Sequence, residues 1–328
     1  MPITYQYETL ATLRERAKEE VGKVVVGQGR AVELLLIAAM ARGHVLLEGP
    51  PGTAKTLLGR ATAYVLGADF NRVQFTPDTT PTELVGENIT RAGETKFVSG
   101  TIFTNVLLAD EINRTPPRTQ AALLEAMAEL QVSVDGQTHV LPSPFVVLAT
   151  DNPIEYEGTY PLPEAQLDRF MLRVRLGYLD PSGEVAMLKR RLDRGSAPPK
   201  LDRVVEGPEL LAMRESLELV RVDPDVLDYV VALVSATRVH PQVAVGASPR
   251  GGLALVALAR GRAVLAGRDY VTPEDVKSVA VPALGHRISV RPELWVRRVT
   301  GDDIVGELLG SVATPATQPA VRHPTGTR

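Results

Sequence analysis

The chain has 328 residues, of which 44% are hydrophobic and 23% are charged, and its formal net charge is −3. These values predict about two globular domains and exclude a generally basic nucleic-acid binder, while the absence of cysteine excludes disulfides, thiol nucleophiles and cysteine metal sites. The sequence has no apolar run near the ~20 residues that span a bilayer and no secretory signal at its start, so we expect a cytoplasmic protein without membrane insertion.

The first 66 residues predict two helices followed by a strand, a loop and a third helix. Residues 8–21 are charged and favour a helix, whereas residues 30–42 are apolar nearly all round, which is typical of a buried helix. Residues 45–48 form a short apolar run that predicts a buried strand. A loop rich in Gly and Pro follows over residues 49–56, and residues 57–66 have the composition of a helix.

The next hundred residues predict further strands of the same sheet. Residues 76–101 are rich in Thr, Pro, Gly and Glu and predict a loop or an insertion. Asp135-Gly136 lies between two alternating segments and predicts a β-hairpin over residues 131–141. The other regular elements that we expect are strands at 105–109, 145–149 and 170–176 and a helix at 119–130.

After residue 179 the strand signals fade. Each of several dipeptides fits a helix start, with a capping residue before Pro: Asp180-Pro181, Gly207-Pro208, Asp223-Pro224, Ser248-Pro249 and Thr272-Pro273. We therefore expect an α/β domain over residues 1–179, an all-helical domain over 180–310 and a disordered tail over 311–328.

The loop between the first predicted strand and the third helix resembles the phosphate-binding pattern G-x-x-x-x-G-K-[ST]. It reads Gly49-Pro50-Pro51-Gly52-Thr53-Ala54-Lys55-Thr56, and Leu57 follows it. Ala54 replaces the second glycine of the pattern; it keeps its N–H group, and we expect it to adopt the ordinary φ of a helix start. The backbone N–H groups and Lys55 would hold phosphates, and Thr56 would bind Mg²⁺. A chance turn before a helix is the alternative interpretation.

An acidic pair at the end of the second strand argues against that alternative. Asp110 and Glu111 follow residues 105–109, 55 residues after Lys55. Because neighbouring parallel strands end at the same edge of a sheet, the pair should lie beside the phosphate loop. Asp110 would then hold Mg²⁺, and Glu111 would activate the attacking water as a general base. A surface strand end is the alternative.

Long segments of the chain closely resemble the MoxR family of AAA+ ATPases. They lie at residues 109–136, 150–170, 246–250 and 271–288, and the resemblance covers about residues 20–290. It implies an AAA+ P-loop core, in which helices flank a parallel sheet, followed by a helical lid. It also implies ATP hydrolysis with Mg²⁺ in a homo-oligomeric ring, usually a hexamer.

The resemblance implies roles for further residues. Asn152 matches the sensor-1 position, Arg169 the arginine finger and Arg250 the sensor-2 position. A surface salt bridge with Asp168 is the alternative for Arg169, and the resemblance leaves open whether Arg250 acts in cis or in trans. Val26-Gly27-Gln28 resembles the segment that flanks the adenine.

The family further implies a chaperone-like function that remodels, assembles or activates a protein complex, with a von Willebrand factor A domain protein as a separate partner. The insert at residues 75–103 and the hairpin at 131–141 resemble elements that face the pore or a partner. Phe97 and Phe103 in the insert could contact a partner or could pack the insert itself. A nucleic-acid-dependent motor and a magnesium-chelatase-like subunit are alternatives, and the net charge of −3 argues against nucleic acid as a partner.

Overall fold

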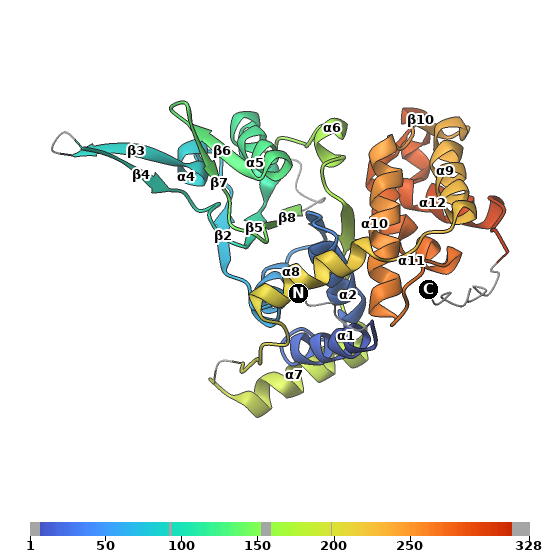
Figure 1. Cartoon of the computed structure of the whole chain (residues 1–328), viewed down its shortest axis with the longest axis horizontal. Coiled ribbons are helices and arrows are strands. Elements are labelled where there is room, and N and C mark those ends of the chain that lie inside the picture. Colours follow the sequence, from blue (N-terminus) through green and yellow to red (C-terminus); the bar gives the residue numbers. More distant parts are fainter. Residues whose placement is uncertain (1–6, 92–93, 152–158, 198, 317–328) are drawn as a thin grey trace, which may run out of the picture.

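The computed structural model describes residues 7–91, 94–151, 159–197 and 199–316. Figure 1 shows a sheet with its helices at the centre, an arm of two strands on one side and a group of helices on the other. Across the described ranges, no helix combines the length and the apolar character needed to cross a membrane.

The first part of the chain contains the sheet and the arm. Its elements are α1 (Tyr7–Gly22), α2 (Gly29–Met40), β1 (Val45–Glu48), α3 (Lys55–Val65), β2 (Phe70–Gln74), α4 (Pro81–Val85), β3 (Gly86–Arg91), β4 (Glu94–Ser99), β5 (Val106–Asp110), α5 (Pro117–Glu129), β6 (Gln131–Val134), β7 (Gln137–Val140), β8 (Val146–Asp151), α6 (Glu164–Leu167) and β9 (Leu172–Arg175). The central sheet has the order β2-β5-β8-β1-β9, and its pairs are parallel.

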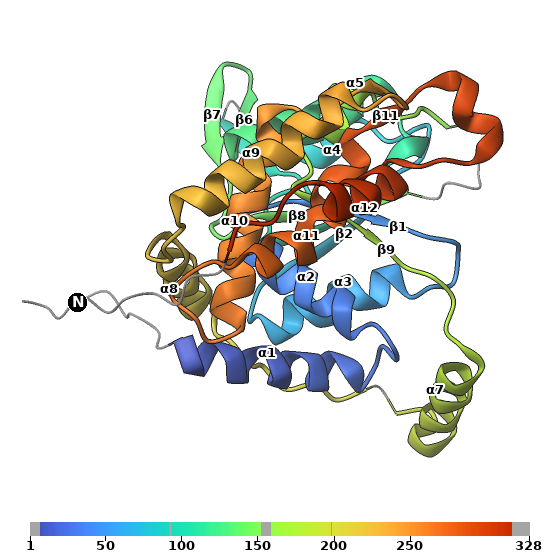
Figure 2. The ribbon, with the colours of Figure 1, turned by 90° about the vertical axis from the view of Figure 1, so that its right-hand side faces the viewer.

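Two hydrophobic cores lie on the two faces of this sheet. Val45 and Leu47 of β1 face the core formed with α1, α2 and α3, whereas Leu46 faces the core formed with α5. Figure 2 shows α1 to α3 beneath the sheet and α5 above it. Because both faces are covered, the strands are apolar without interruption, and this made β1, β5 and β8 predictable from the sequence.

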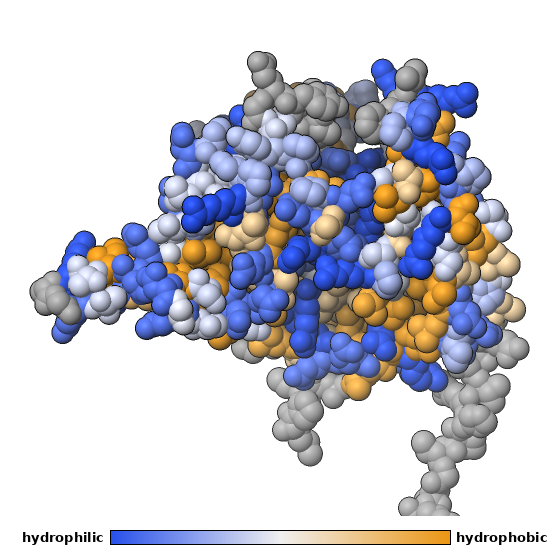
Figure 3. All heavy atoms as spheres, turned by 90° about the horizontal axis from the view of Figure 1, so that it is seen from above, coloured by the Kyte–Doolittle hydropathy of each residue, from blue (hydrophilic) through white to orange (hydrophobic). Residues whose placement is uncertain are grey.

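Two features of this part differ from the sequence predictions. Strand β2 was not predicted, because Phe70–Gln74 is half exposed at the sheet edge and lacks an apolar pattern. Residues 76–101, predicted as a loop or insertion, form α4 and the antiparallel pair β3–β4, which makes the arm in Figures 1 and 3. The predicted hairpin at 131–141 is confirmed as β6–β7.

The arm and the β6–β7 hairpin pack against each other. The rings of Phe97 and His139 are stacked with centroids 3.7 Å apart, and Phe103 contacts Phe97 edge-on at 5.6 Å. Asn88 Nδ2 donates to Asp135 Oδ2 at 3.0 Å. Both phenylalanines therefore contribute to the internal packing of the arm.

The second part of the chain is mainly helical. Its elements are α7 (Pro181–Arg194), α8 (Gly207–Glu218), α9 (Pro224–Val239), β10 (Val243–Val245), α10 (Pro249–Leu265), α11 (Pro273–Leu284), β11 (Ser289–Val290) and α12 (Gly301–Ser311). The antiparallel pair β10–β11 adds a small sheet to the predicted all-helical domain. The domain boundary at residue 179 stays a prediction, as does the disorder of the tail, of which residues 317–328 lie outside the described residues.

Most predicted helix starts are confirmed by their caps. The side chains of Asp180, Asp223, Ser248 and Thr272 each accept a backbone N–H at the start of α7, α9, α10 and α11. The prediction for α8 was one residue off, because Glu206 occupies the cap and Gly207 is already helical.

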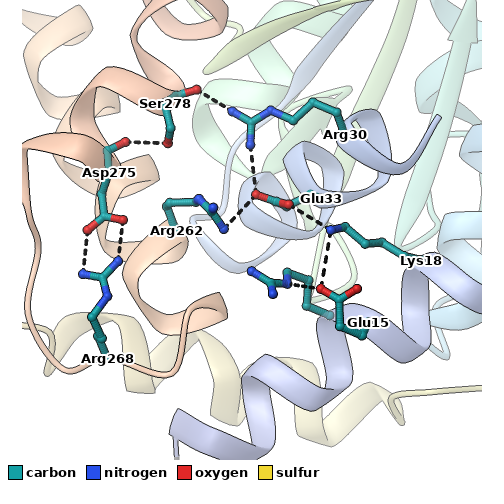
Figure 4. A network of polar contacts seen from close by, with 9 residues as sticks. Glu15, Lys18, Arg30, Glu33, Arg262, Arg268, Asp275 and Ser278 are labelled. Atoms are coloured by element: carbon teal, nitrogen blue, oxygen red, sulfur yellow. Dashed lines mark hydrogen bonds and ion pairs between the residues drawn. The ribbon is translucent and has the colours of Figure 1, made fainter. Parts of the chain in front are cut away.

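A charged network joins the helical part to the sheet part (Figure 4). Glu33 of α2 is buried and pairs with Lys18 of α1, Arg30 of its own helix and Arg262 of α10. Arg30 also donates to the Ser278 carbonyl of α11. The lid helices α10 and α11 are therefore tied to the helices that support the sheet.

Candidate functional site

The phosphate-loop sequence connects the carboxyl end of β1 to α3. Gly49 leaves no room for a side chain, since a Cβ there would lie 2.3 Å from the Leu176 carbonyl oxygen, and Gly52 has a φ of +82°. The Thr53 hydroxyl donates to the Pro50 carbonyl at 2.9 Å. Lys55 Nζ donates to the carbonyls of Gly49 and Pro50. The loop carbonyls therefore surround the Lys55 ammonium group at the start of α3. The start of a helix is a place where anions bind favourably.

The prediction for Ala54 was wrong. Its φ is +64° and its ψ is +26°, in the left-handed region, and α3 begins at Lys55 rather than at Leu57. A residue with a Cβ pays about 1–2 kcal/mol in this conformation. The loop needs this turn to enter α3, so Ala54 carries backbone strain that a glycine would not.

Asp110 lies at the carboxyl end of β5, next to the phosphate loop. Its Oδ2 accepts from the Thr56 hydroxyl at 3.2 Å and from Arg72 Nε and Nη2 at 2.9 and 2.7 Å. Its Oδ1 accepts from the Thr150 hydroxyl at 2.6 Å. The predicted proximity of Thr56 and Asp110 is thus present, with Arg72 balancing the charge of the buried carboxylate.

Glu111 follows in a left-handed conformation, with a φ of +60°. Its backbone N–H donates to the Thr150 hydroxyl at 2.8 Å. Its Oε2 accepts from Gln74 Nε2 at 2.8 Å and pairs with Arg114 Nε at 2.9 Å. Thr150 therefore contacts both acidic residues, and Gln74 and Arg114 hold the Glu111 carboxylate.

Sequence reasoning missed Arg72, Gln74 and Thr150. Arg72 and Gln74 belong to β2, which was itself missed, and Thr150 directly follows the strand predicted at residues 145–149. The signal that could have found Thr150 is its place at the end of a buried strand that neighbours the acidic pair in the sheet. Asn152, the predicted sensor-1 residue, lies outside the described residues.

A cavity of about 460 Å³ adjoins the phosphate loop. It lies between this loop, the segment before α2, and the connection from β9 to α7. Among the residues that line it are Val26, Gln28, Gly52, Thr53, Ala54, Leu57, Tyr178, Leu179 and Met187. Gly27 has a φ of +74°, and a Cβ there would lie 2.7 Å from Leu179 Cδ2. Most of this lining is apolar, and Lys23, Glu184 and three arginines of α7 also line the cavity. Such a cavity beside a phosphate loop suits a nucleoside, and sequence reasoning missed Tyr178 and Leu179.

The oxygen ligands at the loop fit a nucleotide-bound Mg²⁺. Thr56 offers a hydroxyl and Asp110 a carboxylate, and Mg²⁺ prefers such hard oxygen ligands. Within the part of the chain that the structure describes, no three His, Asp or Glu side chains form a metal-binding group.

Arg169 and Arg250 lie together at the amino ends of the strands, which is the opposite edge of the sheet from the phosphate loop. They line one hollow of about 250 Å³ with His44, Met127, Ala128 and Asp168. Arg169 Nη1 donates to the Leu124 carbonyl at 2.7 Å, and the salt bridge with Asp168, the alternative interpretation of Arg169, is absent between these two described residues. Arg250 is exposed at the start of α10.

The strand register places the residues that follow Arg169 at the opposite end of β1 from the phosphate loop. The Met171 N–H donates to the His44 carbonyl at 2.8 Å, so the residues before β9 lie at the amino end of β1. The phosphate loop begins at the carboxyl end of the same strand. Four residues of β1 separate the two ends, which at ~3.3 Å per residue is roughly 10 Å or more. Neither arginine is among the residues that line the cavity beside its own phosphate loop.

Two family descriptions match the chain. Residues 44–172 match the "ATPase family associated with various cellular activities (AAA)", and residues 235–308 match the "AAA lid domain". The second match begins within α9 and includes α10, α11 and Arg250.

Relatives match over almost the full length. The chain is 43% identical over 312 residues to Chaperone MoxR1 of Mycobacterium tuberculosis, covering 92% of this chain and 82% of that protein. It is 44% identical over 323 residues to the uncharacterized protein YeaC of Bacillus subtilis, covering 98% and 100%. A crystal structure of a candidate ATPase from Cytophaga hutchinsonii superposes with a TM-score of 0.86 at 39% identity, covering 94% of this chain and 98% of that one.

Proposed function

Since this chain belongs to the MoxR family of AAA+ ATPases, we propose that it binds and hydrolyses ATP in a homo-oligomeric ring, most simply a hexamer. The observation that carries this proposal is the placement of the site residues at two opposite edges of the sheet. One edge holds the phosphate loop and the acidic pair, and the other holds Arg169 and Arg250. A complete site then needs two subunits.

At the first edge, residues 49–56 bind the phosphates through backbone N–H groups and Lys55. The cavity lined by Val26, Gln28 and Leu57 receives the adenosine. Thr56 and Asp110 hold Mg²⁺, which neutralises phosphate charge when it is bound. Glu111 takes the proton of the attacking water, and Asn152 orients that water or the γ-phosphate.

At the second edge, Arg169 and Arg250 act in trans. An arginine that reaches the transferring phosphoryl group stabilises the charge of the transition state and contributes about 10³–10⁵ in rate. Both arginines lie away from the phosphate loop of their own subunit, and they line one hollow. The phosphate groups that both could reach together are therefore those of ATP bound to a neighbouring subunit. Loss of the γ-phosphate would remove both contacts and move the lid that carries Arg250.

The work done with this energy is the remodelling, assembly or activation of a protein complex. The relative named Chaperone MoxR1 supports a chaperone-like function. A von Willebrand factor A domain protein is the proposed partner, and the arm with the β6–β7 hairpin is a surface that could contact a client. The net charge of −3 argues against a nucleic-acid motor, and a magnesium-chelatase-like subunit is a variant of the same ring mechanism. A cytoplasmic location remains part of this proposal.

The test mixes two inactive variants. Arg169→Ala keeps the phosphate-loop side intact, whereas Glu111→Gln keeps the arginine side intact. We expect each variant alone to lose ATP turnover and the mixed oligomers to recover part of it, because each mixed interface can pair two intact halves. An active monomer at wild-type rate, or mixed oligomers confirmed by mass that recover no turnover, would refute the shared site.

A further inference from the structure

Asp168 connects the two arginines of the second edge through hydrogen bonds. The Arg250 backbone N–H donates to the Ser248 hydroxyl oxygen at 3.1 Å. The Ser248 hydroxyl donates in turn to Asp168 Oδ2 at 2.9 Å. Asp168 immediately precedes Arg169 in the chain. Two hydrogen bonds and one peptide link therefore join the backbone of Arg250, in the lid, to that of Arg169, beside the sheet.

Arg287 holds the same turn from the other side. Its Nε donates to Asp168 Oδ1 at 2.8 Å, and its Nη2 donates to the carbonyls of Asp168 and Phe170 at 3.1 and 2.8 Å. Its Nη1 donates to the Met171 carbonyl at 3.0 Å and to the Ala283 carbonyl. The guanidinium has five N–H donors, and four of these contacts fix residues 168–171, the turn that carries Arg169.

The ion pair between Arg287 and Asp168 compensates the free-energy cost of burying the two charges. The Arg287 side chain is 3% exposed and that of Asp168 is 17% exposed. Burial lowers the pKa of Arg287, while the hydrogen bond and charge of Asp168 act in the opposite direction. Removing the carboxylate would leave a buried cation without its counter-ion, and the turn and the start of α10 would lose their common anchor.

We propose that Asp168, Ser248 and Arg287 are positioning residues that hold Arg169 and Arg250 at a fixed separation, so that both reach the same phosphate group of the neighbouring subunit. This inference rests on the proposed trans site. It adds that the lid and the arginine finger are coupled directly: α10 cannot shift relative to residues 168–171 without breaking the Ser248–Asp168 bond or moving Arg169 with it.

The experiment compares Asp168→Ala and Ser248→Ala with the wild-type oligomer. We expect turnover per assembled subunit to fall at least about tenfold, because displacements of about 1 Å in a catalytic site can cost 10²-fold. The KM for ATP and the binding of a fluorescent ATP analogue should change less than about twofold, because the phosphate-loop side is intact. Ser248→Thr keeps the hydroxyl and the helix cap, and it should retain turnover.

The matched control is Asp275→Ala. Asp275 is a buried carboxylate in the lid that caps the start of α11. Like Asp168 it accepts from an arginine, because Arg268 donates to its two oxygens at 2.8 and 2.6 Å (Figure 4). Among the described residues, Asp275 forms its hydrogen bonds with Arg268, Thr272 and Ser278 and none with residues 168–171. The control should lose stability but keep turnover per assembled subunit within about twofold, which separates positioning from a general loss of lid stability.

Mixing with Glu111→Gln supplies a readout that a purely structural defect would not change. A subunit with a displaced arginine pair keeps its own phosphate-loop side, so an intact arginine side from a Glu111→Gln neighbour should restore turnover, as we expect for Arg169→Ala. Should Asp168→Ala fail to assemble, Ser248→Ala decides the question, since it removes a single hydroxyl group.

Two outcomes would overturn the inference, and both leave the proposed function standing. One is wild-type turnover in Ser248→Ala and in any assembled Asp168→Ala, while Arg169→Ala is inactive. The other is a loss of turnover in Ser248→Ala that mixing with Glu111→Gln does not restore. Wild-type turnover in both Arg169→Ala and Arg250→Ala would instead refute the trans site itself.

Discussion

Glu33→Gln tests how firmly the lid is joined to the rest of the molecule. The Glu33 side chain is 7% exposed, and its oxygens lie 3.2 Å from Lys18 Nζ, 2.9 Å from Arg30 Nη1 and 3.0 Å from Arg262 Nη1. These cations come from α1, α2 and α10. Glutamine has almost the same shape and can still accept hydrogen bonds, so the substitution removes the charge and little else.

The expected loss in the free energy of unfolding lies between the values for buried and for exposed ion pairs. Breaking a fully buried ion pair costs about 3–5 kcal/mol, whereas an exposed pair contributes about 0–1 kcal/mol. The three partner side chains are 26%, 47% and 27% exposed, so each can recover part of its hydration. We therefore expect a loss of about 2 kcal/mol in stability and, for a chain of 328 residues, a fall in Tm of about 3 °C.

Glu15→Gln is the matched control for this experiment. Glu15 belongs to the same network, and it contacts Lys18 Nζ at 3.5 Å, but its side chain is 60% exposed. The Glu15→Gln variant should lose less than about 0.5 kcal/mol of stability, and this difference should vanish at high salt, because exposed charges are screened. Thermal unfolding by circular dichroism at low and high salt measures both variants. A loss for Glu33→Gln below about 0.5 kcal/mol, or one that salt abolishes, would refute the reasoning.

Three further predictions concern the buried polar groups and the loop. Burial lowers the pKa of His44 to about 4, so the unfolded chain takes up a proton first as the pH falls, and His44 should contribute about 2 kcal/mol to the loss of stability between pH 6.5 and 5. Burial also lowers the pKa of His286, which adds to the same loss. In urea titrations His44→Gln should drop less than the wild type, and equal drops would contradict the assignment. Thr150→Val leaves the Glu111 N–H and Asp110 Oδ1 without their shared hydroxyl. We expect ATP turnover, measured by phosphate release, to fall about tenfold, and stability, measured by urea unfolding, to fall by about 1–3 kcal/mol. Unchanged turnover would be the contrary result. Ala54→Gly should stay within about 0.5 kcal/mol of wild type, because relief of backbone strain offsets lost chain rigidity, whereas Ala54→Val should lose at least about 1 kcal/mol in thermal unfolding; a stable valine variant would contradict the positive φ.

The elements that the sequence predicted well are those specified by local chemistry or by burial. The strand over residues 45–48 is apolar because both faces of the sheet are covered, and the caps at Asp223 and Ser248 act on N–H groups within two residues. Strand β2 carries neither signal, because it is half exposed and its register comes entirely from β5. Because β2 was not predicted, Arg72 and Gln74 were not predicted as site residues either. The proximity of Thr56 and Asp110 was predictable, because the ends of neighbouring parallel strands lie at the same edge of the sheet.

The arginine side of the site could not be predicted from its own motif, because its partners are chosen by tertiary packing. Asp168 precedes Arg169 and was its partner in the alternative interpretation, a surface salt bridge, yet its carboxylate binds Arg287, which lies 119 residues later in the chain. Adjacent residues of a turn direct their side chains differently, so Arg169 instead reaches the Leu124 carbonyl of α5. The consequence concerns function: two arginines that the family resemblance identifies separately share one anchor, and the test of that anchor is whether Ser248→Ala impairs both at once.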